Sequence, residues 1–312
     1  SKAALAYYDM GRIFLTQKNK ELYTENFEKA INADPQFSPA YYQMYRHFLV
    51  TDPARSKQYF LQYRQNADPS LDQDYAYTDL LYLTKNCDSA IQSANKIITA
   101  EGDSAQPRLY KLISYCLQEK ADTATALEYI TRYFRNEVDS NIVLKDYETM
   151  SLLYSTVDGR EDSSIYYLEK AAMLATESKT KINYYQKLAA LSKESENYAK
   201  ESYWRMQLYS SDPAASNVAL FNWGLAAYKA QDFQQADSVF GIYADKYSDQ
   251  GFGYYWRARS NAAMDSASEK GLAVPHYQKL IEVIGTDTAN AQNKKWMKEA
   301  LGYLGSYEAN NE

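Results

Sequence analysis

The feature that most constrains the fold of this chain is a pattern that recurs after 34 residues. Pro35 and Pro69 each follow an Asp at the end of an apolar stretch, and they lie 34 positions apart. The same shift aligns three further pairs, namely Tyr7 with Tyr41, Met10 with Met44 and Phe14 with Phe48. Within each block the apolar residues are three or four positions apart, which is helix spacing, and a short polar break divides the block into two helices. The pattern predicts an all-α fold, an α-solenoid superhelix of tandem helix-turn-helix repeats.

The scarcity and the positions of proline and glycine favour the same fold. The chain has 11 Gly and 7 Pro in 312 residues, which is about half of average usage. Ser38-Pro39 and Asp52-Pro53 each place a capping side chain before a proline, which is the order expected where a helix begins. So few turn-forming residues argue against β-sandwiches and against Gly-rich nucleotide-binding folds.

The order of residues within the blocks carries a family resemblance. The first block places Tyr7, Met10, Gly11 and Phe14 on its first helix, and Phe27, Ala30 and Pro35 follow on and after its second helix. Another close copy is Trp223, Gly224, Ala236, Phe240 and Tyr243. This order resembles the tetratricopeptide repeat (TPR), in particular Tyr-rich bacterial TPR proteins. The resemblance implies that Gly224 packs against the second helix of its own pair.

The resemblance covers essentially the whole chain and implies a single repeat domain over residues 1–312. We expect eight repeats, at 4–37, 38–71, 72–104, 105–141, 142–179, 180–214, 215–251 and 252–287. A closing helix over 290–307 should follow, with Trp296, Leu301 and Leu304 covering the exposed end of the last pair. Alternatively, the sequence stops within a repeat.

Some repeats depart from the family pattern. Tyr45 stands where the first helix should have a small residue, and Lys57 and Arg64 stand at small positions of the next helix. Glu201 replaces an expected Ala in the sixth repeat. The registers of the third and sixth repeats are left open.

Catalytic motifs are lacking, so we expect a protein that is not an enzyme and uses no cofactor. The two histidines, His47 and His276, are far apart in sequence, and the chain has no H-x-x-x-H, C-x2-C or P-loop motif. Gly251 and Gly253 lack the third glycine of the dinucleotide fingerprint. No metal site is predicted, and both histidines are expected to be solvated or at the edge of the core.

The net charge of the chain argues against one class of partner. The 34 Lys and Arg against 40 Asp and Glu give a net charge of −6, which argues against nucleic acid as a partner. No apolar run is long enough to span a membrane.

Cys87 and Cys116 are expected to be free thiols or, alternatively, a single bridge between neighbouring helices. The first residues already indicate a helix, so we expect a processed protein or a piece of a longer one. The bacterial resemblance implies export, but the compartment and the oligomeric state are left open.

In the family, the first helices line a concave groove and the second helices form the convex side. The resemblance implies that residues just after the opening aromatic and just after the small position point into this groove, four positions apart on one face. The predicted groove residues are Tyr8, Arg12, Tyr42, Arg46, Lys111, Tyr115, Phe221, Tyr255 and Arg259. Between them, the equivalent positions hold Glu148, Leu152, Gln186, Ala190 and Leu225, so the groove should be neutral in its middle.

These residues predict a protein interaction module that binds an extended peptide segment, with an acidic peptide favoured by the clustered cations. The Lys and Asn of the family's carboxylate clamp are replaced by Tyr8 and Arg12, so recognition of chaperone tails is not expected. Two alternatives are an aromatic surface that binds glycans and a sensory or scaffolding part of a longer multi-domain protein. Aromatic–cation pairs four apart also stabilise a helix without any ligand.

Overall fold

A computed structural model describes residues 1–212, 215–285 and 290–311. This part of the chain contains 17 α-helices, two single-turn 3₁₀ helices and no β-strand, which confirms the predicted all-α fold. The helices form two compact units, Ser1–Ile142 (unit 1) and Val143–Glu312 (unit 2).

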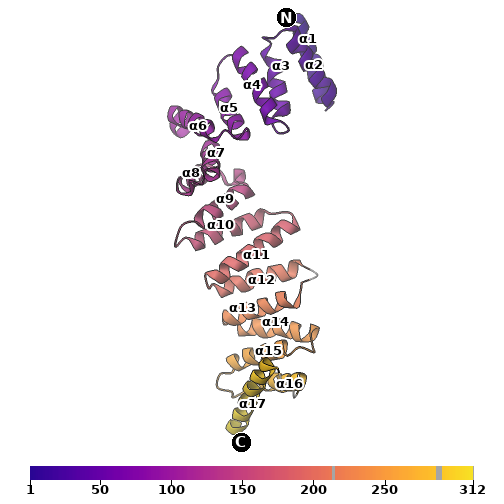
Figure 1. Ribbon diagram of the computed structural model, residues 1–312, viewed down its shortest axis with the longest axis vertical. Helices are drawn as coiled ribbons and strands as arrows, with labels where there is room; N and C mark the ends of the chain where they lie inside the picture. Colours follow the sequence, from indigo (N-terminus) through magenta and orange to yellow (C-terminus); the bar gives the residue numbers. More distant parts are fainter. Residues whose placement is uncertain (213–214, 286–289, 312) are drawn as a thin grey trace. The chain divides into compact units, whose positions relative to one another are not determined.

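Unit 1 contains four helix pairs in sequence order (Figure 1). They are α1 (Lys2–Thr16) with α2 (Lys20–Ala33), α3 (Ser38–Phe48) with α4 (Pro53–Asn66), α5 (Leu71–Leu83) with α6 (Cys87–Glu101), and α7 (Arg108–Glu119) with α8 (Thr123–Asn136). The 3₁₀ helices η1 (Gly102–Ser104) and η2 (Asp139–Asn141) lie in connections. The short turns within the pairs make the paired helices antiparallel.

Unit 2 continues the same scheme with four pairs and one further helix (Figure 1). They are α9 (Leu144–Tyr154) with α10 (Glu161–Leu174), α11 (Ser178–Glu194) with α12 (Tyr198–Ser211), α13 (Asn217–Lys229) with α14 (Phe233–Lys246), and α15 (Gly251–Met264) with α16 (Val274–Ile284), followed by α17 (Ala291–Asn311). In both units each helix packs against its neighbours in sequence, as in a tandem helical repeat.

A recurrent turn joins the two helices in five of the pairs. Its last residue is an Asn or Asp at the N-cap position of the second helix, and the residue before it has a left-handed backbone. In α1–α2, Lys18 has φ 57° and the main-chain N–H of Asn19 donates to the carbonyl of Phe14 over 3.0 Å. The same arrangement occurs at Lys85, Ala121, Glu196 and Gln231. This hydrogen bond over five residues is that of a Schellman motif, so one turn both ends the first helix and begins the second.

Small residues in the first helices allow close approach of an aromatic side chain from the second helix. A Cβ atom added to Gly224 in α13 would lie 2.8 Å from the ring of Phe240 in α14. In α1, a Cβ added to Gly11 would lie 2.5 Å from the ring of Phe27 in α2. The predicted contact of Gly224 with the second helix of its own pair is therefore confirmed.

The closing helix α17 covers α15 and α16 of unit 2. Trp296 is 3% exposed and packs on Tyr255, with ring centroids 4.9 Å apart. Leu304 also packs against this core. The prediction for Leu301 is wrong, because this side chain is 56% exposed. It follows the buried Ala300 directly and therefore points about 100° away from the packed face of the helix.

The two cysteines are free thiols on neighbouring helices, with Cys116 buried and Cys87 half-buried. Burial raises the pKa of both thiols. Among the described residues, no helix is both long enough and apolar enough to cross a membrane.

Candidate binding surface

Six of the nine predicted groove residues lie in unit 1, in pairs on α1, α3 and α7. The other three lie in unit 2, with Phe221 on α13 and both Tyr255 and Arg259 on α15. All of them stand on first helices of their pairs, as expected. Their surroundings differ, and these differences decide which of them can meet a ligand.

The pairs on α1 and α3 are similar. The guanidinium of Arg12 lies 6.0 Å from the ring centroid of Tyr8, and that of Arg46 lies 5.6 Å from the ring of Tyr42. Both arginines are exposed, and neither forms an ion pair with a carboxylate in residues 1–212, 215–285 or 290–311. Each guanidinium therefore retains N–H groups that can donate to a ligand.

Neighbouring aromatic rings hold the tyrosines of both pairs in place. Tyr8 contacts Phe37 edge to face, with centroids 5.5 Å apart, and Tyr42 contacts Tyr63 at 5.2 Å. The side-chain amide of Gln43 on α3 donates to the hydroxyl of Tyr8 on α1 over 3.4 Å. This bond joins the two helices beside the predicted residues, so we call Tyr8, Arg12, Tyr42, Gln43 and Arg46 the α1–α3 face.

Arg46 also borders a cavity of about 360 Å³ between α1, α2 and α3. The cavity is lined by Leu15, Lys20, Tyr23, Phe27, Gln43, Arg46, His47 and Thr51. The hydroxyl of Tyr23 lies 2.6 Å from Nδ1 of His47. Burial lowers the pKa of His47, and the positive charges of Lys20 and Arg55 lower it further. The residues that line the cavity thus include the two basic side chains Lys20 and Arg46 and no carboxylate.

The pair on α7 has a different environment from the α1–α3 face. Lys111 donates to the hydroxyl of Tyr133 over 3.2 Å and lies 4.7 Å from the centroid of the same ring. Tyr115 lies beside Tyr82, with ring centroids 6.4 Å apart. The ammonium group of Lys111 is therefore directed to the second helix of its own pair.

In unit 2 the predicted residues belong to aromatic packing. Phe221 contacts the rings of Phe240, Phe252 and Trp256 and lines a cavity of about 260 Å³. Tyr255 is only 5% exposed, and its hydroxyl donates to Glu299 of α17 over 2.9 Å.

The guanidinium of Arg259 also contacts other side chains of unit 2, namely three aromatic rings and one carboxylate. It lies within 6 Å of the rings of Tyr228, Tyr255 and Trp256. Its Nε is 3.6 Å from a carboxylate oxygen of Glu299. The pair on α15 is therefore packed against α17, whereas the α1–α3 face has no such cover among the described residues.

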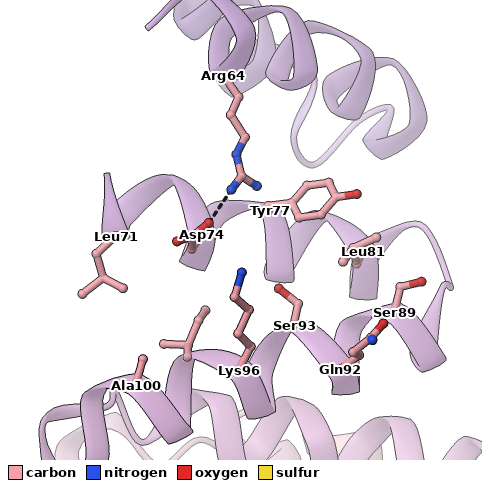
Figure 2. A pocket seen from close by; sticks show the side chains of 11 residues that line it. Arg64, Leu71, Asp74, Tyr77, Leu81, Ser89, Gln92, Ser93, Lys96 and Ala100 are labelled. Atoms are coloured by element: carbon pink, nitrogen blue, oxygen red, sulfur yellow. Dashed lines mark hydrogen bonds and ion pairs between the residues drawn. The ribbon is translucent and has the colours of Figure 1, made fainter. Parts of the chain in front are cut away.

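The structure also has a cavity that the sequence analysis did not identify, between α4, α5 and α6 of unit 1 (Figure 2). Its volume is about 550 Å³, and we call it the α4–α6 cavity. It is lined by Arg64, Leu71, Asp74, Tyr77, Leu81, Ser89, Gln92, Ser93, Lys96, Ile97 and Ala100. The signal in the sequence was Arg64, a long cation at a position where the repeat pattern has a small residue.

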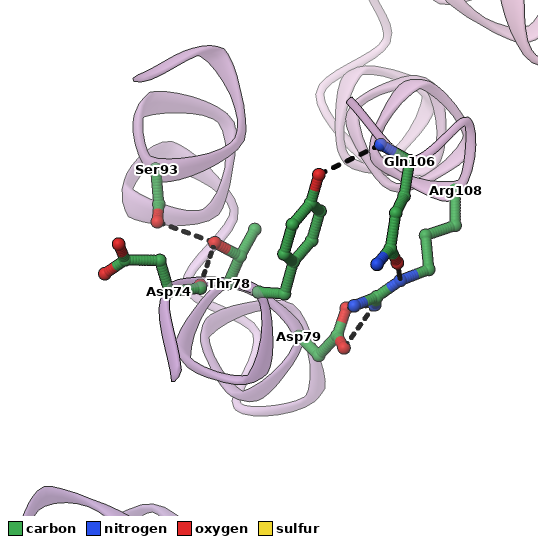
Figure 3. A network of polar contacts seen from close by, with 7 residues as sticks. Asp74, Thr78, Asp79, Ser93, Gln106 and Arg108 are labelled. Atoms are coloured by element: carbon green, nitrogen blue, oxygen red, sulfur yellow. Dashed lines mark hydrogen bonds and ion pairs between the residues drawn. The ribbon is translucent and has the colours of Figure 1, made fainter. Parts of the chain in front are cut away.

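Polar contacts fix α5, which forms one wall of this cavity (Figure 3). Arg108 of α7 pairs with Asp79 of α5, and burial raises the pKa of that carboxyl against the lowering effect of Arg108. The main-chain N–H of Gln106 donates to the hydroxyl of Tyr75 over 2.9 Å. These contacts hold α5 on α7 and so set the position of the cavity wall.

Unit 2 has a cavity of about 500 Å³ between α9, α10 and α11. Leu152, Ala190 and Glu148, which the pattern placed at equivalent groove positions, line it together with Lys145 and Lys187. The hydroxyl of Tyr184 donates to Glu148 over 2.7 Å. Among the described residues, no three His, Cys, Asp or Glu side chains gather in a way that could hold a metal ion.

Similarity to known proteins is found among solved structures. No protein-family model and no curated protein matches the chain. Among solved structures, the C-terminal part of a TPR repeat-containing protein from Cytophaga hutchinsonii is 25% identical, with 76% of this chain and 88% of that chain covered and a TM-score of 0.39.

Two further solved structures are similar. The TPR domain of P58(IPK) is 14% identical, with coverage of 97% and 89% and a TM-score of 0.31. PilW, a widely conserved type IV pilus biogenesis factor, is 11% identical, with coverage of 69% and 96% and a TM-score of 0.49. The structural neighbours of this chain are TPR-repeat proteins, including bacterial ones.

Proposed function

We propose that this protein is a non-enzymatic interaction module that binds an extended, acidic peptide segment on the α1–α3 face. The proposal rests on the repetition of one exposed arginine beside one tyrosine on two linked first helices. Within the described parts of the chain, no carboxylate is paired to either arginine. A guanidinium can bind a carboxylate through two parallel hydrogen bonds while its plane stacks on an aromatic ring.

The arrangement suits an extended ligand. Neighbouring helices lie roughly 10 Å apart, and an extended peptide advances about 3.3 Å per residue. Arg12 and Arg46 would then meet acidic residues about three positions apart in the ligand. Lys20 and Arg46, at the cavity between α1, α2 and α3, would add to the attraction for negative charge.

The contacts of the other cations limit the proposal to the α1–α3 face. Arg259 already faces Glu299, and Lys111 already bonds to Tyr133. A ligand would have to compete with these contacts, whereas at the α1–α3 face it would meet no carboxylate already paired to either arginine among the described residues. The remaining predicted residues would contribute to packing between helices and not to recognition of the ligand. They are Tyr115, Phe221 and Tyr255.

The test is a peptide array followed by titration. Peptides of about ten residues, which span roughly 33 Å when extended, are screened for binding, and the tightest acidic peptide is labelled and titrated by fluorescence polarisation. We expect binding to weaken as NaCl is raised, because the contacts lie at the solvent boundary. The double variant Arg12→Ala with Arg46→Ala should weaken binding at least about tenfold, since both anchoring charges are lost.

The matched control is Arg132→Ala with Arg135→Ala on α8. Arg132 lies 5.6 Å from the ring of Tyr129 and is exposed, so this variant removes the same charge and a similar aromatic contact from a second helix. Its affinity should equal that of the unchanged protein. Equal affinities of the two double variants would show that the α1–α3 face is an ordinary solvated surface.

A further inference from the structure

The α4–α6 cavity has the size and the mixed polarity of a small-molecule site, and it lies outside the α1–α3 face. Its volume of about 550 Å³ is within the range of roughly 300–1,000 Å³ that is usual for such sites. Figure 2 shows the polar ends of Arg64, Asp74, Ser93 and Lys96 converging on the space between α4, α5 and α6. Leu71, Ile97 and Ala100 form an apolar end.

The charges of the lining residues leave one positive charge without a partner. Arg64 pairs with Asp74 over 2.5 Å, using one carboxylate oxygen. Lys96 forms no ion pair with a carboxylate in the described parts of the chain, and Figure 2 shows its ammonium directed into the cavity. One bound carboxylate would therefore neutralise the site, and Lys96 and Arg64 would both be in position to hold it.

The hydrogen bonds around α5 determine whether the Ser93 hydroxyl donates or accepts on the side of the cavity. Thr78 donates its only hydroxyl proton to the main-chain oxygen of Asp74 over 2.8 Å. Thr78 and Ser93 are 2.6 Å apart, so Ser93 must be the donor in this bond (Figure 3). The oxygen of Ser93 can then only accept from the cavity. Together with the second carboxylate oxygen of Asp74, it offers acceptors for ligand hydroxyl groups.

The remaining polar side chains complete a set that matches a polyhydroxylated ligand. Ser89 and Gln92 can each donate and accept, as sugar hydroxyls do. The ring of Tyr77 is not a stacking platform, because Phe60 stacks on it at 6.3 Å and the guanidinium of Arg64 lies 5.3 Å from its centroid. Recognition here would come from hydrogen bonds and charge.

We propose that the α4–α6 cavity binds an acidic sugar, a pyranose ring that carries one carboxylate. Lys96 and Arg64 hold the carboxylate, Asp74 and Ser93 accept from ring hydroxyls, and the C–H groups of the ring face Leu71 and Ile97. A neutral sugar lacks the charge that Lys96 requires, and a simple carboxylate leaves the acceptors of Asp74 and Ser93 unused.

The probes that test this are glucuronate, glucose and acetate, titrated into the full chain by isothermal calorimetry or by NMR chemical-shift mapping. Glucuronate should bind, and glucose and acetate should each bind at least about tenfold more weakly, because each lacks half of the recognised groups. Acetate binding as tightly as glucuronate would reduce the site to a simple anion site and overturn the proposal. Glucose binding as tightly would overturn it as well.

Variants locate the site and separate it from the α1–α3 face. Lys96→Met keeps most of the length of the side chain and removes its charge, and it should lower glucuronate affinity at least about tenfold. The helix should stay folded, because Lys96 is exposed. The control is Lys2→Met, which changes an exposed lysine of the same unit that has no ion pair within residues 1–212, 215–285 and 290–311. This variant should bind normally. Unchanged affinity in Lys96→Met would contradict the assignment. The Arg12→Ala with Arg46→Ala variant should bind glucuronate normally, so failure here and failure of peptide binding are distinguishable.

Discussion

The pairs Tyr42–Arg46 in unit 1 and Tyr255–Arg259 in unit 2 have the same sequence spacing and nearly the same local geometry. The guanidinium lies 5.6 Å from the tyrosine ring in α3 and 5.8 Å in α15. Their surroundings differ, since α17 places Trp296 against Tyr255 and Glu299 against Arg259, whereas Arg46 borders a cavity. A spacing of four along one helix therefore brings the tyrosine and the arginine together. Whether the arginine can bind a ligand depends on the helix that packs beside the pair.

The strongest test of this comparison is removal of the Trp296 side chain from α17. Trp296→Ala should lower the free energy of unfolding of unit 2 by about 3–5 kcal/mol, because it deletes a nearly buried ring. All four tryptophans, Trp204, Trp223, Trp256 and Trp296, lie in unit 2, so urea unfolding followed by fluorescence reports on that unit. The control is Leu301→Ala on the same helix, which is exposed and should change stability by less than about 0.5 kcal/mol. Similar losses in both variants would mean that α17 does not pack as described.

The next effect in size concerns the close contacts within helix pairs of both units. Gly224→Leu in unit 2 and Gly11→Leu in unit 1 should each cost about 1–3 kcal/mol, because an added side chain overlaps the ring of Phe240 or Phe27. Thermal unfolding by circular dichroism measures both. Gly241→Ala is the control, since its new Cβ would be 3.6 Å from the side chain of Arg257, an ordinary contact. It should be neutral or should stabilise α14 by up to about 1 kcal/mol. A stable Gly224→Leu protein would contradict the register of its repeat.

A smaller effect is expected when the charge that neutralises Arg259 is removed. Glu299 accepts hydrogen bonds from Tyr255 over 2.9 Å and Tyr277 over 3.2 Å, besides its contact with Arg259. Because the site is about a third exposed, Glu299→Gln should cost about 1 kcal/mol. Glu282→Gln, which breaks a surface pair with Lys279, should cost less than about 0.5 kcal/mol.

The Glu299→Gln variant also tests the comparison itself. Arg259 would then lack a carboxylate partner, as Arg46 does, and an acidic peptide should bind unit 2 measurably in a protein that also carries Arg12→Ala and Arg46→Ala. No gain in binding would mean that ring packing alone keeps Arg259 unavailable.

The local part of this structure could be predicted from the sequence, and the long-range part could not. Helix spacing identified the pairs, because they follow from periodicity. The resemblance to the tetratricopeptide repeat implied the contact of Gly224 with the second helix of its pair. The Tyr–Arg contacts in α1, α3 and α15 follow from a spacing of four. In contrast, the contacts of Arg259 with Glu299 and of Lys111 with Tyr133 join residues of different helices, and no repeat pattern encodes which acid or ring lies opposite. The α4–α6 cavity was missed for the same reason, although Arg64 marked it as an irregular position.

The smallest expected effect is a pH dependence that contrasts the two histidines, one in each unit. Burial lowers the pKa of both His47 and His276 below the ordinary value of 6.5. Lys20 and Arg55 lower that of His47 further, and for His276 the lowering by Arg257 is opposed by Asp237. The unfolded state therefore binds more protons than the native state as pH falls below about 6.5, and stability should decrease over that range.

The contrast between the two sites lies in what surrounds each ring. Both charges that act on His47 are positive, whereas Asp237 favours the charged form of His276. We therefore expect His47→Gln to remove more of the decrease in stability between pH 7 and pH 5 than His276→Gln does, as measured by urea unfolding with circular dichroism. If His276→Gln removes more, then the cations Lys20 and Arg55 do not raise the potential at the cavity beside Arg46, and the argument for negative ligands at the α1–α3 face loses one of its supports.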